Sequence, residues 1–192
     1  MRKLPGVEIA ACSSLNALNA PFAKNITSVY TTDGRKVTYS IAPVDFDFFE
    51  TFGIAPLAGR LFERGRAGDS VMSPPGAAPG PPPADAAPPI LINQAAATSL
   101  GYLTPADAIG KRMNWRNAPP GAPASPPSEI IGVVPDIPMS VSAAADPYFY
   151  FIAPRASGML SIRMASEDFG GTVREIQRVW KDTGNIRPIQ IR

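Results

Sequence analysis

The chain concentrates its large aromatic side chains in one short segment, because five of its nine phenylalanines fall within residues 44–62. Three of them recur at every third position and would share one face of a helix: Phe46, Phe49 and Phe52. Asp45 is predicted to cap this helix by accepting a backbone N–H, and Gly53 is predicted to end it in a left-handed conformation. The segment therefore predicts a short helix and turn packed into the core.

Composition bounds the class of protein. A compact chain of 192 residues forms one or two domains and buries roughly 70% of its unfolded surface. The 18 Lys and Arg and the 16 Asp and Glu are scattered along the chain, which argues against nucleic acid or an acidic membrane surface as a partner. Histidine is absent, which excludes Ser-His-Asp and Cys-His catalysis and most zinc sites.

The single cysteine, Cys12, cannot form an internal disulfide and is expected to be a core residue. Residues 9–12 superficially match a lipoprotein cleavage box, but Pro5, Gly6 and Glu8 interrupt the apolar segment that such a signal needs. No stretch approaches the roughly 18 continuous apolar residues of a membrane span. The chain as given is therefore expected to be soluble.

Periodicity and turn signals predict an alternation of strands and helices. Strands are expected at 7–15, 26–32, 35–42, 90–92, 111–115, 128–134, 148–152, 160–164 and 188–191, and helices at 94–100 and 168–182. Asp33-Gly34 is a strong hairpin signal between two of these strands. Asn93 is predicted to cap the helix at 94–100. Pro135 is predicted to end the strand at 128–134, since proline cannot donate a hydrogen bond to a neighbouring strand.

Two proline-rich stretches, 64–89 and 117–127, offer little to bury and cannot satisfy a regular backbone ladder. Both are expected to be exposed insertions. The alternative is that they are docking peptides for a partner protein, although proline-rich composition alone carries no recognition code.

The only tight carboxylate cluster is formed by Asp45, Asp47 and Glu50. A hydrolase would use two carboxylates roughly 5 to 10 Å apart in a deep pocket. Helix capping and the helix dipole already explain acidic residues at this position, and Glu50 stands where a calcium-binding EF-hand loop needs glycine. Arg60, between Gly59 and Leu61, is expected to be partly buried and to bind a carboxylate or backbone carbonyls.

Several motifs together resemble one known family. The matching residues are Leu4-Pro5-Gly6-Val7, Asp45-Phe46, Phe49, Phe52-Gly53-Ile54, Leu57, Gly59-Arg60-Leu61-Phe62, Asn93, Ile109-Gly110-Lys111, and Ile130-Ile131-Gly132-Val133-Val134 with Asp136. The chain resembles, on these residues, the MacB-like periplasmic core domain of ABC-transporter permeases. It departs from the family pattern at Gln94, where Glu is commoner, and at Pro135, where Gly or Ala is usual.

The resemblance implies an α+β fold with two lobes, as does the strand, amphipathic helix and strand at each end of the sequence. Residues 1–43 and 137–192 would form a discontinuous terminal subdomain of βαβ type, similar to a porter subdomain. Residues 44–136 would form a second, mixed α/β subdomain inserted into it, carrying both proline-rich loops. Twelve residues would be structural signature positions: Asp45, Phe46, Phe49, Gly53, Gly59, Arg60, Phe62, Asn93, Gly110, Lys111, Gly132 and Asp136.

The resemblance also implies a function without chemistry in this chain, with no catalytic, cofactor or metal site. Such domains lie on the periplasmic side of the bacterial inner membrane and couple to ATP hydrolysis on a separate nucleotide-binding domain. The implied partners are the membrane spans of the same permease, an ATP-binding subunit, a second permease copy and a periplasmic adaptor. Two alternatives remain at this point: a free-standing module that binds proteins through its proline-rich loops, and a small hydrolase that uses carboxylates.

Overall fold

The fold was analysed in a computed structural model, which describes residues 4–15, 25–30, 36–69, 89–113, 127–137, 145–153, 159–165 and 168–184. The strands are β1 (Val7–Ser13), β2 (Asn25–Tyr30), β3 (Lys36–Val44), β4 (Ala58–Gly59), β5 (Pro89–Asn93), β6 (Arg112–Met113), β7 (Ser128–Val134), β8 (Tyr148–Ile152) and β9 (Met159–Met164). The helices are α1 (Phe48–Thr51), α2 (Gln94–Ser99) and α3 (Phe169–Asp182), with short 3₁₀ turns η1 (Ala67–Asp69) and η2 (Pro105–Ala108).

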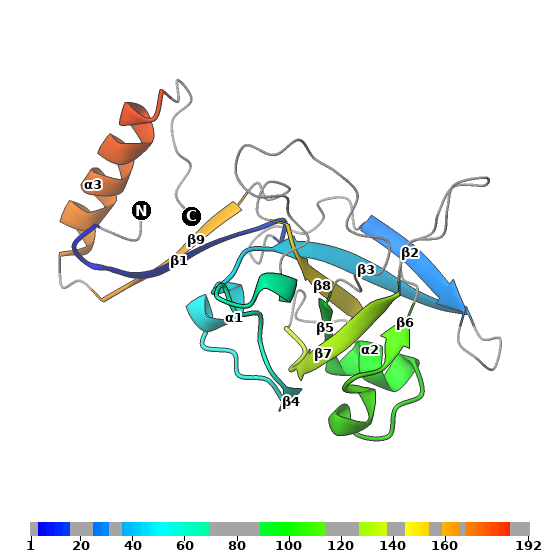
Figure 1. Ribbon diagram of the computed structural model, residues 1–192. Helices are drawn as coiled ribbons and strands as arrows, with labels where there is room; N and C mark the ends of the chain where they lie inside the picture. The colour runs from blue at the N-terminus through cyan, green and yellow to red at the C-terminus, as the bar shows by residue number, and fades with distance from the viewer. Residues whose placement is uncertain are drawn as a thin grey trace.

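All nine strands belong to one mixed sheet with the order β4-β7-β5-β8-β3-β1-β9, to which β2 adds beside β3 and β6 beside β7 (Figure 1). The β3–β8 and β5–β7 pairs are parallel, and the other pairs are antiparallel. The α+β class is therefore confirmed. The division into subdomains at residues 43 and 137 stays a prediction.

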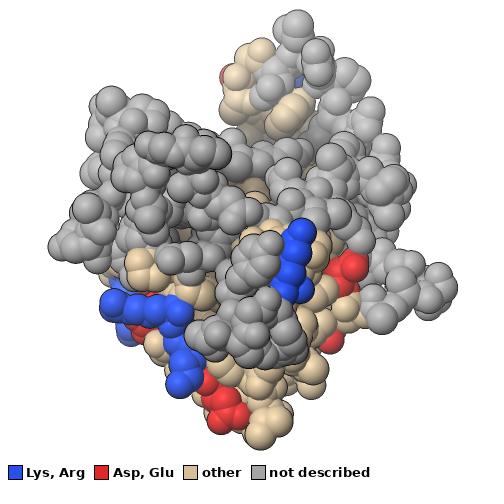
Figure 2. All heavy atoms as spheres, turned by 90° about the vertical axis from the view of Figure 1, so that its right-hand side faces the viewer, with Lys and Arg blue, Asp and Glu red and all other residues tan. Residues whose placement is uncertain are grey.

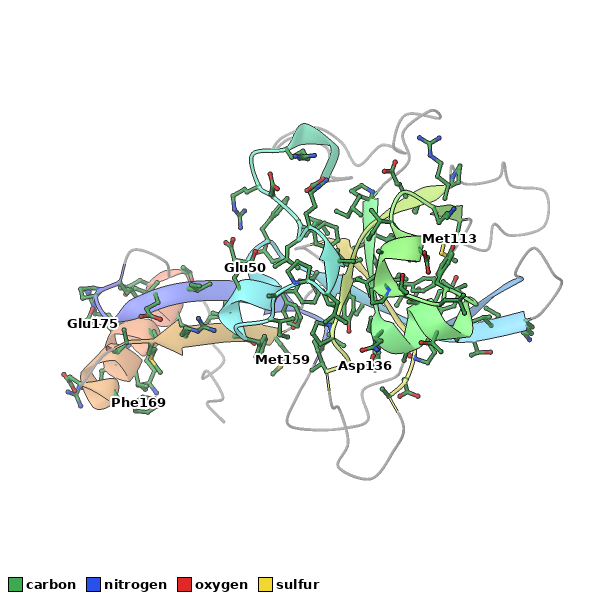
Figure 3. The ribbon with its side chains drawn as sticks, turned by 90° about the horizontal axis from the view of Figure 1, so that it is seen from below. Glu50, Met113, Asp136, Met159, Phe169 and Glu175 are labelled. Carbon is green, nitrogen blue, oxygen red and sulfur yellow. The ribbon has the colours of Figure 1, made fainter. Side chains whose placement is uncertain are left out.

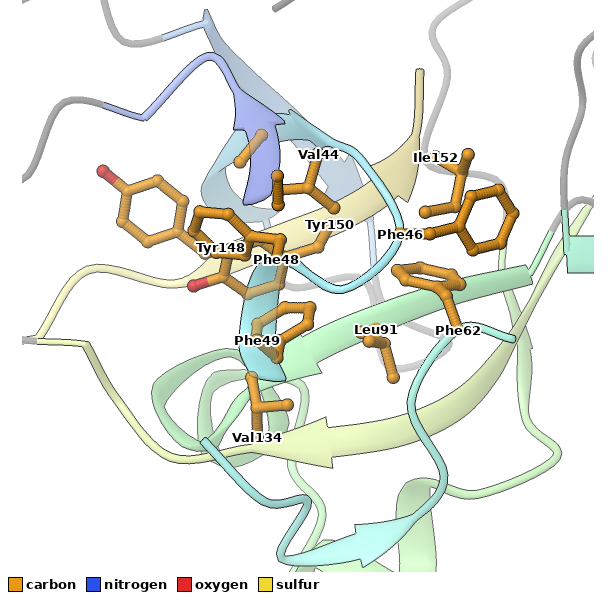
Figure 4. Packing of buried hydrophobic residues seen from close by; sticks show 12 residues of the cluster. Val44, Phe46, Phe48, Phe49, Phe62, Leu91, Val134, Tyr148, Tyr150 and Ile152 are labelled. Atoms are coloured by element: carbon orange, nitrogen blue, oxygen red, sulfur yellow. The ribbon is translucent and has the colours of Figure 1, made fainter. Parts of the chain in front are cut away.

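Each face of the sheet carries a buried apolar cluster. Successive side chains of a strand point to opposite sides, so one strand can contribute to both clusters. In β5, Leu91 belongs to one apolar cluster, and Ile90 and Ile92 belong to the other. The first cluster lies under α1 and contains Phe46, Phe48, Phe49 and Phe62 (Figure 4). The second lies under α2 and η2, where Tyr39 stacks on Phe149 with ring centroids 3.9 Å apart.

Local sequence signals account for most of the element boundaries. The hairpin predicted around Asp33-Gly34 is formed by β2 and β3, although the turn itself lies outside the described residues. Asn93 caps α2 through its side chain, and β7 ends at Val134 directly before Pro135. The strand predicted at 188–191 also lies outside the described residues.

Two expectations about the phenylalanine segment are wrong. The residue at the N-cap of α1 is Asp47, in a left-handed conformation (φ 65°), and its side chain makes no capping bond. The Asp45 carboxylate instead accepts a hydrogen bond from the adjacent Phe46 N–H at 2.8 Å, and the Asp45 carbonyl accepts the Phe48 N–H at 3.3 Å. Because α1 has only four residues, the three-residue spacing does not define one face: Phe48 is buried, whereas Phe52 is 46% exposed.

One expectation about the first proline-rich stretch is also wrong at its edges. Residues 64–66 are exposed, as expected, but the segment ends in η1, where Asp69 is buried. At the other end, Pro89 is the first residue of β5 and is buried too. Residues 70–88 and 114–126, which hold the rest of both stretches, lie outside the described residues.

The longest helix of the described residues, α3, has 14 residues and begins with Asp168, whose carboxylate accepts the Gly171 N–H at 2.7 Å. Its apolar positions are only partly covered: Ile176 is buried, and Phe169 is 58% exposed. None of the described helices is long and apolar enough to cross a bilayer.

Candidate functional site

The residues singled out from the sequence form three groups, at the β4–β7 edge of the sheet, at the junction of β5, β7 and β8, and at the corner where β3 turns into α1. At the edge, Gly59 of β4 lies opposite Gly132 of β7. A Cβ on Gly59 would overlap the carbonyl oxygen of Ile131 and lie 2.9 Å from the Gly132 Cα, and a Cβ on Gly132 would overlap the Arg60 carbonyl oxygen. The φ of +73° at Gly59 also favours glycine. The two glycines thus allow β4 and β7 to approach closely.

Arg60 continues from this contact and forms a clamp with Asp69. Its guanidinium donates two hydrogen bonds to the carboxylate, at 2.5 and 2.7 Å, and a third to the Leu61 carbonyl at 3.0 Å. The Asp69 side chain is 1% exposed and also accepts the Glu63 N–H at 2.8 Å. The hydrogen bonds that Arg60 donates to Asp69 raise the pKa of Arg60, so the guanidinium stays charged. The clamp therefore closes residues 60–69 into a compact loop.

Asn93 and Asp136 form a second polar junction, between β5, β7 and β8. The Asn93 side-chain oxygen accepts the Ala96 N–H at 3.0 Å and the Tyr148 N–H at 2.8 Å, and its amide donates to the Asp146 carbonyl at 2.8 Å. Asp136 accepts the Ala95 N–H at 2.9 Å. Two side chains thus satisfy the free N–H groups of the first turn of α2 and tie it to the start of β8.

Gly110 and Lys111 act through their backbones in the described contacts. Gly110 donates to the Ile130 carbonyl at 2.8 Å, and the Lys111 carbonyl accepts the Ile130 N–H at 2.9 Å. The Lys111 side chain is exposed. These bonds hold η2 beside β7 and extend the pairing that β6 continues.

The third group surrounds residues 45–47, here called the elbow, which join β3 to α1. Phe46 is buried beside Phe62 and Ile152 in the first cluster (Figure 4). The ring of Phe49 meets Tyr150 edge-on at 5.1 Å between centroids. Burial raises the pKa of Tyr150, which keeps its phenol neutral. The aromatic core therefore fixes the underside of the elbow.

The carboxylates at the elbow are engaged in local contacts. The Arg64 guanidinium lies 3.7 Å from the Asp45 carboxylate and 3.5 Å from that of Asp47. Partial burial of Glu50 raises its pKa, with the Asp47 charge adding to the effect. Among the described residues, no three acidic, Cys or His side chains come close enough to hold a metal ion.

The two ends of the described chain form a projection, here called the terminal arm, which comprises β1, β9 and α3. Figures 1 and 3 show the arm extending to one side. All other elements are here called the body, of which α1 lies next to the arm. Among the described residues, β1 and β3 share one register pair, Ser13 with Val44. Two backbone bonds flank it, from Ser14 to Pro43 at 3.0 Å and from Asp45 to Cys12 at 2.7 Å. This pairing, here called the seam, joins the arm to the body together with the packing of β1 and β9 against α1, where Ala11 lies in the first apolar cluster.

Charge is mixed on the face shown in Figure 2, where basic and acidic side chains alternate among uncharged ones. Arg112 lies 3.9 Å from Glu129 across the β6–β7 pair, and both side chains are largely exposed. The described residues of this face form no broad surface of one sign.

Sequence reasoning missed Asp69 and Arg64. Asp69 lies in a stretch whose proline and glycine content predicted an exposed loop, so its burial was not expected. The available signal was Arg60 itself, since a half-buried guanidinium requires a carboxylate or carbonyl partner nearby. Arg64 had no comparable signal, because its partners at the elbow are brought to it by the β3-to-β4 connection.

No family model matches the chain, and no curated protein matches it. Solved structures do share its fold. The extracellular domain of the ABC-type transporter YknZ from Gram-positive bacteria superposes with a TM-score of 0.59 at 15% identity, over 97% of this chain and 81% of that one. A permease domain from Porphyromonas gingivalis gives 0.57 at 19% identity, over 95% and 66%. The periplasmic region of MacB from Actinobacillus actinomycetemcomitans gives 0.57 at 13% identity, over 95% and 70%. The chain therefore has the MacB-like periplasmic core fold of ABC-type permeases, as the sequence motifs predicted.

Proposed function

We propose that this chain is the extracytoplasmic domain of a bacterial ABC-type export or mechanotransmission permease. In this role the domain does no chemistry of its own. It couples ATP hydrolysis on a separate nucleotide-binding domain to the handling of a substrate or partner in the periplasm. The fold shared with the extracellular domain of an ABC-type transporter, the periplasmic region of MacB and a permease domain supports the assignment.

The observation that supports the coupling role is that both ends of the described chain lead into the terminal arm, through β1 at one end and α3 at the other. Membrane helices that continue the chain on either side would therefore pull on the arm first. The seam and the packing of β1 and β9 against α1 would then transmit the motion to the body.

The proposed location is the periplasmic side of the inner membrane. The proposed partners are the membrane spans of the same permease, an ATP-binding subunit or domain, a second permease copy and a periplasmic adaptor. No cofactor is required in this chain, because the nucleotide binds elsewhere.

The coupling role is tested by measuring the distance between arm and body in the full-length permease. Spin labels at Gln177 on α3 and Thr98 on α2 report this distance, since both side chains are exposed. Cys12 is replaced by alanine so that only the introduced cysteines react. The expected result is a shift in the interspin distance distribution when ATP binds.

A second labelled pair lies within the body, at Lys36 and Thr98, and serves as the control, because both positions are exposed and neither belongs to the arm. Its distribution should not change with nucleotide. Identical distributions for the arm–body pair in the nucleotide-free and ATP-bound states would contradict the coupling role.

A further inference from the structure

Arg64 has an unusual environment for an exposed arginine, because its side chain reaches from the loop of residues 61–69 to the elbow. Its guanidinium carbon lies 4.7 Å from the centroid of the Phe46 ring, which is itself only 6% exposed. The same group lies 3.5 Å from Asp47 and 3.7 Å from Asp45. One cation thus meets a fixed aromatic face and two carboxylates, and each contact favours it in this position.

The elbow is the part of the body that touches the seam. The Asp45 N–H donates to the Cys12 carbonyl of the arm at 2.7 Å. Asp47, two residues after Asp45, has a φ of 65°, which residues other than glycine adopt at some cost in free energy. Its carbonyl oxygen accepts both the N–H and the hydroxyl of Thr51, at 2.9 and 2.7 Å. The elbow therefore keeps a conformation that its surroundings must maintain.

Arg64 reaches the elbow from a rigid base. Asp69 is clamped by Arg60 and accepts the N–H of Glu63, the residue directly before Arg64. Phe62, two residues before Arg64, is buried in the core, and the Arg60 N–H donates to the Ile131 carbonyl of β7 at 3.0 Å. The loop of residues 61–69 is thus anchored to the sheet edge at one end and closed on itself at the other.

We propose that Arg64 is an electrostatic strap that fastens the 61–69 loop to the elbow and holds the terminal arm in the arrangement seen here. Without the guanidinium, the carboxylates of Asp45 and Asp47 would repel each other across the turn. The left-handed conformation of Asp47 would then lose a contact that maintains it, and the seam beside it would open more readily. The relevance of the strap to transport rests on the proposed function, whereas its effect on the arm does not.

The test uses the 192-residue chain with spin labels at Gln177 and Thr98 in the Cys12→Ala background. Arg64→Gln removes the charge of the strap and keeps most of the side-chain length. The expected result is an increase of about fivefold in the population of arm positions outside the main distance peak, equivalent to about 1 kcal/mol.

Arg66→Gln is the matched control. Arg66 belongs to the same loop, is 55% exposed against 52% for Arg64, and pairs at 3.7 Å with Glu63 of its own loop. It should leave the distance distribution unchanged. The proposal is overturned if Arg64→Gln has no effect, or if both substitutions broaden the distribution equally.

A second measurement needs no substitution at the strap and covers the case in which Arg64→Gln fails to fold. Raising the salt concentration from about 0.1 M to about 1 M shortens the screening length from about 10 Å to about 3 Å. The arm distribution of the otherwise unchanged chain should broaden over this range, and that of Arg66→Gln should broaden equally. An arm distribution that does not respond to salt would overturn the strap. Both measurements are independent of whether ATP moves the arm in a full-length permease, so a failure of one proposal does not imply a failure of the other.

Discussion

The close approach of β4 and β7 makes a quantitative prediction for Gly59→Ala. The new methyl group would overlap the Ile131 carbonyl oxygen and lie 2.9 Å from the Gly132 Cα, which are backbone atoms that cannot rotate away. Overpacking of this kind costs about 1–3 kcal/mol. An alanine at φ +73° adds about 1 kcal/mol of backbone strain. The free energy of unfolding should therefore fall by about 2–4 kcal/mol.

Gly110→Ala separates the two contributions. Gly110 has nearly the same φ, +75°, but a Cβ there meets no atom within 4 Å. It should therefore cost about 1 kcal/mol, from the backbone alone. Gly65→Ala, which meets nothing and has no positive φ, should be neutral or stabilising by up to about 1 kcal/mol, because alanine restricts the unfolded chain.

Urea unfolding followed by circular dichroism measures all three variants, with unchanged m-values expected. If β4 peels away instead of destabilising the whole domain, the Leu57 and Arg60 amide protons should exchange faster, since both donate to β7. A Gly59→Ala variant no less stable than Gly110→Ala, with these two amides still protected, would refute the reasoning.

Three further predictions concern buried polar groups and pH. Arg60→Ala should lower the free energy of unfolding by about 3 kcal/mol, measured in urea, because it leaves the buried Asp69 carboxylate without its ionic partner. Arg60→Lys should recover only part of this loss, since lysine cannot donate two parallel hydrogen bonds to one carboxylate. Full recovery would count against the clamp. Asn93→Ala should also cost about 3 kcal/mol, because it removes the helix cap and the acceptor of the buried Tyr148 N–H. Asp168→Ala at the exposed cap of α3 should cost about 1 kcal/mol. Equal costs would contradict the role of Asn93 as a junction. The pKa of Glu50 is raised above its ordinary value of 4.5, so the native state takes up this proton at a higher pH than the unfolded chain does. At pH values above the raised pKa, ionised Glu50 therefore lowers the stability of the native state. Glu50→Gln should therefore raise the melting temperature at neutral pH, with a gain that shrinks as the pH falls toward 4.5; a gain that grew toward acid pH would show the opposite sign.

The elements set by local chemistry could be predicted from the sequence. The β2–β3 hairpin, the cap at Asn93 and the end of β7 before Pro135 each depend on a few neighbouring residues. The position of α1 could not be predicted, because Asp45 and Asp47 are both good capping residues and tertiary contacts of Asp45 with the arm decide between them.

The candidate site depends more on contacts between distant segments. Gly59 and Gly132 were recognisable as motif positions, but their contact follows from a pairing of strands separated by most of the body. Asp69 was hidden by the proline-rich composition around it, since composition predicts exposure and carries no information about a single buried carboxylate. The seam likewise follows from the strand order, which periodicity alone does not specify.

Whether this domain belongs to a membrane permease can be tested by reading the coding sequence outward from both ends of the chain. We expect a run of about 20 apolar residues shortly before residue 1 and further runs of similar length after residue 192. A secretion signal with no other apolar run would contradict the permease assignment, and would make this fold a free periplasmic module with no membrane helices to move its arm.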